Sequence, residues 1–208
     1  MERERGGRGG DAPRDAAVRW LAARGATVRF FAEADNCVRP RDGEEGDAAP
    51  FLIEVQGTPN LFHELAHIVL LGRIAKDHAT EHSRIPFQLE QEHGRRLFAE
   101  ELACCIASCA WHPGSDTDAR AWLDEQVGIQ PCFFGMEGEL PRFLAACERA
   151  LATDRAGFAA ICARALAEIG VALRAGGLPE GAATPPRRFE PFTEWRALLL
   201  RNGVAPTG

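Results

Sequence analysis

The sequence lacks the features of a membrane or secreted protein. None of its apolar runs approaches the roughly 18 to 20 residues that cross a bilayer. The opening stretch, MERERGGRGGDAPRD, is charged and glycine-rich with no apolar run behind it, so it does not resemble a secretory signal. We therefore expect a cytoplasmic protein that makes no membrane contact.

A basic surface and paired cysteines are also missing. The net charge of −6 argues against a nucleic-acid binder, because neutralising phosphates needs a basic face and the arginines here are scattered. The seven cysteines are an odd number and include no CxxC pair. In a reducing compartment such cysteines are best interpreted as small buried hydrophobic side chains.

Apolar and β-branched residues predict a small sheet near the N-terminus. ATVRFFAEADNCV (26–38) and PFLIEVQG (50–57) have the composition of strands, and a polar loop with turn residues connects them. A helix over 11–25 comes before them, with Asp11 as its N-cap and Gly25 as its terminating residue. At 46% hydrophobic and 208 residues, the chain is expected to form one soluble domain with additions.

Helical periodicity dominates the rest of the chain. We predict a helix over 59–73, a long helix over 86–111 that HPGS ends, and shorter helices over 118–128, 138–152, 155–177 and 192–203. Residues 177–191 are expected to form an irregular strap. The prediction is an α+β fold, mainly helical with a small β-sheet. Its parts are a flexible tail (1–10), a main domain (11–176) and a C-terminal strap and helix (177–208).

The stretch NLFHELAHIVLLG places two histidines four residues apart around a glutamate. Positions i and i+4 of a helix project from the same face, so His63 and His67 can bind one metal ion. Glu64 is then close enough to take a proton from a water at an open coordination position, an arrangement that suits amide hydrolysis with zinc. The alternative is a core helix whose histidines bond to backbone carbonyls. Burial of unsatisfied imidazoles is costly, which favours the metal site.

A catalytic zinc needs a third protein ligand. The glycine and histidine that extend HExxH in metzincins would fall at Leu70 and Arg73, which disfavours that class. A second helix, RRLFAEELACCIASCAW, supplies carboxylates instead. Helical geometry leaves the choice between Glu100 and Glu101 open, because each shares its helix face with small residues.

HELAH, followed about thirty residues later by the aromatic-Ala-x-Glu-Leu helix FAEELACCIAS, resembles the zincins that have a glutamate as third ligand. The similarity is closest to the zincin-like domain of ArdC-type antirestriction proteins and more distant to the ImmA/IrrE metallopeptidases. It covers residues 60–111 only. The resemblance implies a zincin-like metallopeptidase domain, a Zn²⁺ cofactor and a peptide or protein substrate.

The resemblance also assigns the ligands. The EEL alignment makes Glu101 the third ligand, with Glu100 as the alternative. Glu92 is a third candidate, since EHGRRLFA echoes the ImmA/IrrE spacing, although two arginines replace the small residue and the amide of that family. The acidic or amide residue that often follows the third ligand and supports a histidine would be Cys105 or Cys104 here, which is a departure from the pattern.

The sequence therefore predicts a zinc metallopeptidase in which His63, His67 and Glu101 hold the metal and Glu64 is the general base. Two alternatives stay open: a zinc-binding regulatory or antirestriction-like interaction module without turnover, and a HExxH hydrolase acting on a non-peptide substrate. In zincins the strand before the active-site helix often forms the cleft edge that pairs with an extended peptide. For residues 50–57 this role and that of an internal strand are both open. We interpret His78, His82 and His93 as solvent-exposed side chains.

Overall fold

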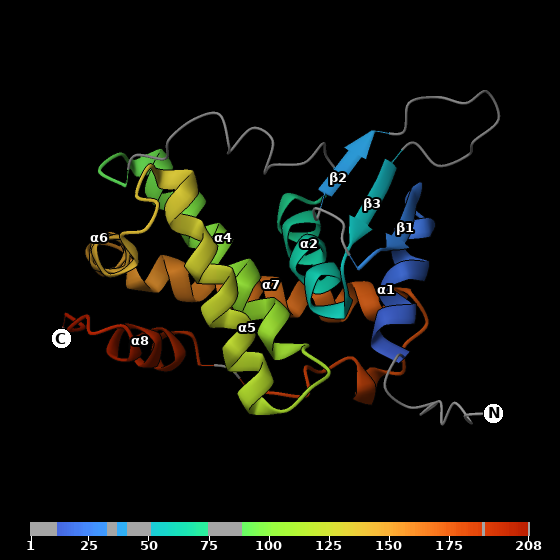
Figure 1. Cartoon of the computed structure of the whole chain (residues 1–208). Coiled ribbons are helices and arrows are strands. Elements are labelled where there is room, and N and C mark those ends of the chain that lie inside the picture. The colour runs from blue at the N-terminus through green and yellow to red at the C-terminus, as the bar shows by residue number, and fades with distance from the viewer. Residues whose placement is uncertain (1–11, 33–36, 41–50, 75–88, 189, 208) are drawn as a thin grey trace, which may run out of the picture.

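The computed structural model describes residues 12–32, 37–40, 51–74, 89–188 and 190–207. Within these ranges the chain forms seven α-helices, two short 3₁₀ helices and one three-stranded mixed sheet (Figure 1). The α+β class, with a small sheet and a majority of helices, is as predicted. The predicted tail over 1–10 and the N-cap Asp11 lie outside the described residues.

The prediction of one strand over 26–38 is wrong, because the segment forms two strands on opposite edges of the sheet. After α1 (Ala12–Ala22) and a turn at Gly25, where φ is +81°, come β1 (Ala26–Phe30), β2 (Cys37–Pro40) and β3 (Phe51–Val55). The strand order is β1-β3-β2, with β1 parallel and β2 antiparallel to β3.

The sheet register explains this division. Val28 of β1 and Val38 of β2 both lie opposite Ile53 of β3. One continuous strand cannot place both valines beside Ile53, so the chain reverses between them. Since β3 has a strand on each side, it is an internal strand, and the idea that β3 itself forms a cleft edge is wrong.

α2 (Thr58–Leu71) follows β3 directly and carries the HELAH motif. It ends at Gly72, which adopts a left-handed φ of +73° that favours glycine. The long helix α4 spans Glu92–Ala110, shorter at its start than the predicted 86–111; residues 86–88 lie outside the described part. α4 packs along α2, and α7 packs against both helices.

The remaining α-helices agree closely with the predicted ones. They are α5 (Asp116–Ile129), α6 (Leu140–Ala152), α7 (Arg155–Ala175) and α8 (Pro191–Arg201). The short 3₁₀ helices η1 (Gln130–Phe134) and η2 (Glu180–Ala182) were not predicted, and η2 lies within the predicted strap. A reciprocal capping box between Ser115 and Asp118 starts α5, just after HPGS has ended α4. η1 continues from the last residue of α5 without a loop between them.

Two hydrophobic clusters lie on either side of α4. The first joins α1, the sheet, α2 and the second half of α7; α4 contributes Cys104 and Ala107 to it, and Trp111, which caps the end of α4, also belongs to it. The second joins α5, α6, α8 and the first half of α7, and it includes Phe98, Leu102 and Cys105 from α4. Five of the seven cysteines are buried, as interpreted from the sequence, whereas Cys37 is half-buried and Cys132 is exposed.

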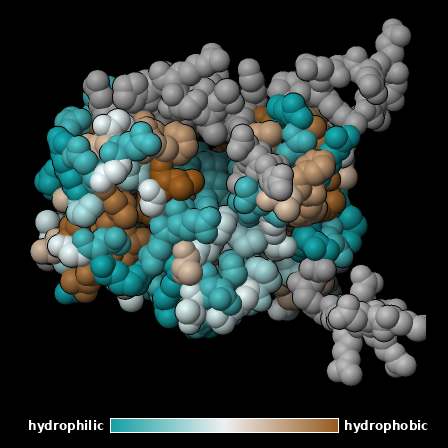
Figure 2. Space-filling view, viewed as in Figure 1, coloured by the Kyte–Doolittle hydropathy of each residue, from teal (hydrophilic) through white to brown (hydrophobic). Residues whose placement is uncertain are grey.

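By length and composition alone, α7 is apolar enough to cross a membrane, which the sequence analysis did not anticipate. In the structure it contacts α1, α2, α4 and α6 and contributes side chains to both clusters. Since 39% of its apolar window is buried, packing explains part of its apolar composition. Hydrophilic residues cover the middle of the face shown in Figure 2, and hydrophobic residues gather toward its two sides.

Candidate metal centre

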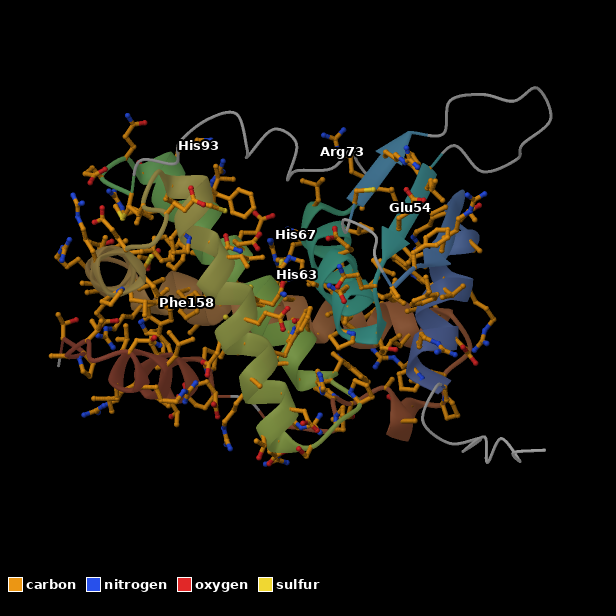
Figure 3. All side chains as sticks on the ribbon, viewed as in Figure 1. Glu54, His63, His67, Arg73, His93 and Phe158 are labelled. Atoms are coloured by element: carbon orange, nitrogen blue, oxygen red, sulfur yellow. The ribbon has the colours of Figure 1, made fainter. Side chains whose placement is uncertain are left out.

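His63 and His67 project from α2 toward α4 and α5, on the side of α2 opposite the sheet (Figure 3). The remaining faces of α2 explain this orientation, because Leu61, Leu65 and Ile68 are buried in the first cluster. With the apolar residues directed into that core, the i and i+4 histidines are left on the face toward α4. The two imidazoles meet at their Nε2 atoms, 3.2 Å apart.

α4 brings one carboxylate to these two nitrogens. The Oε2 atom of Glu101 lies 3.1 Å from Nε2 of His67, and its Oε1 atom lies 3.4 Å from Nε2 of His63. Ligands about 2.0 to 2.1 Å from a tetrahedral zinc ion lie about 3.3 Å from one another. The 3.2 Å between the two Nε2 atoms and the 3.1 Å between Oε2 of Glu101 and Nε2 of His67 have the size of the edges of such a tetrahedron, whereas the 3.4 Å contact to His63 comes from the other carboxylate oxygen, Oε1.

The donor set fits a zinc ion chemically as well as in size. The three residues form the one group of metal-binding side chains found in the described part of the chain, with all ligand atoms within 4.8 Å of one another. Two imidazole nitrogens and a carboxylate oxygen are ligands that zinc accepts. All three side chains are largely shielded from water, so a bound ion would stabilise polar groups that are costly to bury.

Glu100 and Glu92 do not share this arrangement. Glu100 approaches the other ring nitrogen of His67, with 3.7 Å between its Oε1 atom and Nδ1. Glu92 is exposed at the first residue of α4, about two and a half turns before Glu101. Of the three candidate carboxylates, the structure thus places Glu101 beside the two Nε2 atoms.

The charges of the metal-free group reinforce one another. Burial opposes ionisation of Glu101, but the neighbouring His63 and His67 hold its pKa well below the usual range. Burial likewise disfavours protonation of His67, yet hydrogen-bonding contacts with the Cys104 sulfur and with the carboxylates of Glu100 and Glu101 hold its pKa well above the usual value. Burial raises the pKa of the Cys104 thiol to about 11, so this neighbour of His67 is uncharged at neutral pH.

Glu64 is half-buried on α2, next to His63. It is not one of the three residues whose ligand atoms converge. A general base must lie within hydrogen-bond reach of the proton that it takes, so the role of Glu64 stays a prediction.

Sequence reasoning did not identify Gln130, the first residue of η1. Its Nε2 donates a hydrogen bond of 3.0 Å to Oε1 of Glu101. No local signal could have found this contact, because Gln130 lies 29 residues after Glu101 and belongs to no recognised motif.

The two other histidines in the described part of the chain, His93 and His112, do not belong to the group. His93 is exposed, lies 3.3 Å from an Arg96 guanidinium nitrogen, and is well separated from His63 and His67 in Figure 3. Its interpretation as an exposed side chain is confirmed. His78 and His82 lie outside the described residues.

Comparison of the chain with protein-family models, with curated proteins and with solved structures found no match. The resemblance to the zincins therefore rests on HELAH and FAEELACCIAS and on the convergence of their side chains.

Proposed function

We propose that the protein is a zinc-dependent hydrolase of the zincin type that cleaves peptide bonds in a peptide or protein substrate. One observation carries the proposal: two imidazoles and a carboxylate from two helices converge at separations that suit a tetrahedral ion, beside the glutamate of an HExxH sequence.

His63, His67 and Glu101 would hold the zinc ion. When bound, zinc supplies Lewis acidity toward a water molecule and toward the carbonyl of the substrate. Three protein ligands leave one position of a tetrahedral ion open, which is what distinguishes catalytic from structural zinc sites. This ligand count favours a hydrolase over a module in which zinc only stabilises the fold.

Glu64 would be the general base. Its carboxylate takes a proton from the attacking water and later returns it to the departing amine, so one residue performs both transfers. Its place on α2, one residue after His63, keeps its backbone next to that of a metal ligand. Replacing Glu64 by glutamine keeps the size of the side chain and removes its ability to accept the proton.

The test compares wild type with Glu64→Gln for zinc content and for hydrolysis of a mixed peptide library. We expect about one zinc ion per chain in both proteins, and a loss of cleavage on the order of 10² to 10⁴-fold in the variant. Zinc binding without Glu64-dependent cleavage would contradict the peptidase and favour the interaction module or a hydrolase of non-peptide substrates. A folded wild type that binds no added zinc would overturn the peptidase, the zinc-binding interaction module and the hydrolase of non-peptide substrates alike.

A further inference from the structure

Gln130 is a buried polar residue that lies beside the metal centre without being a ligand. It is 5% exposed, and its side-chain nitrogen has two acceptors. One is Oε1 of Glu101 at 3.0 Å, and the other is the backbone carbonyl of Gln126, one turn earlier, at 3.3 Å. The opposite orientation of the amide would place its carbonyl oxygen against both acceptors, so the two contacts together fix which atom faces Glu101.

The packing of α5 on α4 sets this contact. Nearer the start of α5, Nε1 of Trp122 donates to Oγ of Ser108 at 2.8 Å, and Ser108 in turn donates to the carbonyl of Cys105 at 2.7 Å. Ser108 faces Trp122 while Glu101 faces Gln130, so the two helices run antiparallel and are tied by polar contacts at two levels. The hydrogen bond at Ser108 lies about two turns beyond Glu101 along α4, so it is separate from the contact of Gln130 with Glu101.

No other hydrogen bond of this length to Glu101 comes from α4 or α5 among the described residues. Cys105, on the next turn of α4, approaches the same Oε1 atom only at 4.0 Å and is a weak donor. By the resemblance, the acidic or amide residue that supports a histidine would fall at Cys104 or Cys105, about one turn after Glu101, where this sequence has cysteines instead. The structure instead brings an amide to the site from η1.

We propose that Gln130 is the positioning residue of the metal centre, an inference that rests on the metal site of the proposed function. By donating to Oε1 it holds the carboxylate in one orientation and leaves Oε2, which lies 3.1 Å from Nε2 of His67, toward the ion. Hydrogen bonds that orient metal ligands are worth 10- to 100-fold in metal affinity.

The experiment measures metal binding and not catalysis. Gln130→Met has nearly the same length but no donor, and Gln130→Glu replaces the donor with an acceptor. The matched control is Trp122→Phe, which removes the other tie between α4 and α5 and touches no ligand. Zinc affinity is measured by competition with a chromogenic chelator, the coordination geometry by the visible spectrum of bound Co²⁺, and folding by circular dichroism and thermal denaturation.

We expect Gln130→Met to bind zinc about 10- to 100-fold more weakly than wild type and to show an altered cobalt spectrum, with Gln130→Glu weaker still. Trp122→Phe should lose thermal stability and keep both its affinity, within about twofold, and its spectrum. Wild-type affinity and spectrum in a folded Gln130→Met, or in Gln130→Glu should the first variant not fold, would overturn the inference. Equal losses in Trp122→Phe would also overturn it by showing a purely structural role.

These outcomes are separate from those of the proposed function. A wild type that binds cobalt but cleaves no peptide contradicts the peptidase alone, since the affinity comparison does not use turnover. A wild type that binds neither metal overturns both.

Discussion

Replacing either Glu101 or Glu100 by glutamine shows which of these two adjacent residues is the third metal ligand. Glu101 faces the Nε2 atoms of His63 and His67 at 3.4 and 3.1 Å, whereas Glu100 approaches Nδ1 of His67 at 3.7 Å, beyond an ordinary hydrogen bond. The two variants have the same chemistry, the same helix and consecutive positions. Any difference in metal binding therefore reports the direction in which each carboxylate points.

The expected magnitude follows from sharing the binding energy among ligands. Structural zinc sites with four ligands have apparent binding free energies of about 10 to 16 kcal/mol, or roughly 2.5 to 4 kcal/mol per ligand. At about 1.4 kcal/mol per factor of ten, loss of one ligand corresponds to about two to three orders of magnitude. Because an amide oxygen can still coordinate weakly, we expect Glu101→Gln at the lower end, about 100-fold. Glu100→Gln should lose less than about tenfold, since Glu100 only approaches the far side of one ring.

The assay is chelator competition at fixed pH and ionic strength, with thermal denaturation in excess chelator as the control for folding. Both variants must unfold cooperatively in excess chelator, so that the zinc affinities compared are those of folded proteins. A loss in Glu100→Gln equal to or larger than that in Glu101→Gln would refute the assignment of the third ligand. Loss in neither variant would refute a carboxylate ligand from this pair.

Two further predictions concern stability. In excess chelator, Glu101→Gln should be less stable than wild type by the largest margin between roughly pH 4.3 and 6.5, the ordinary glutamate and histidine values. Because the pKa of Glu101 is lowered in the folded protein, the stability that its charge contributes is lost as the pH falls through that lowered value. Because the pKa of His67 is raised, the stability that its charge contributes is lost as the pH rises through that raised value. A stability difference that does not depend on pH in urea titrations would contradict the ion pair. Glu148→Ala should lower the free energy of unfolding by about 2 to 4 kcal/mol in urea, because the buried carboxylate accepts from Trp195 Nε1 at 2.7 Å and from Thr207. The control Glu139→Ala removes an exposed ion pair and should change stability little, so equal effects would count against the buried network.

The strand boundaries show where sequence reasoning reaches its limit. Residues 32–36 (AEADN) are of types that are depleted in strands, so the break between β1 and β2 has a local signal that the prediction of one strand over 26–38 passed over. The placement of β1 and β2 on opposite edges of the sheet, with Val28 and Val38 both opposite Ile53, is tertiary and has no such signal. The later helices, in contrast, were predicted to within about two residues at each end, because amphipathic periodicity and the HPGS stop are local, although α4 begins at Glu92 and not at the predicted residue 86.

Some residues of the candidate site can likewise be predicted from local sequence, whereas others depend on how the helices pack. His63 and His67 could be paired from the sequence, since helix geometry alone brings i and i+4 side chains together. Consecutive residues of a helix point about 100° apart, so choosing Glu101 over Glu100 requires the rotation of α4 about its own axis relative to α2. Gln130 was beyond reach entirely, because its contact depends on the register of a third helix.

The position of α4 between two hydrophobic clusters explains why that rotation is well defined. Cys104 and Ala107 pack into the cluster shared with α2, while Phe98 and Leu102 pack into the opposite cluster. Turning α4 far enough to exchange its two glutamates would withdraw side chains from both clusters at once. Glu101 contacts His63 and His67 of α2 on one side and Gln130 of η1 on the other.

The cysteines of α4 also fit this arrangement. Cys104 is a small side chain at the α2–α4 contact, so the two helices can approach closely enough for Glu101 to reach the Nε2 atoms. Cys105 faces the opposite cluster and is uncharged at neutral pH, because burial raises its pKa well above the usual value. A second carboxylate at position 105 would compete with Glu101 for the donor of Gln130 in a buried environment. The cysteine therefore accords with a metal site whose supporting hydrogen bond comes from η1 and not from the ligand helix.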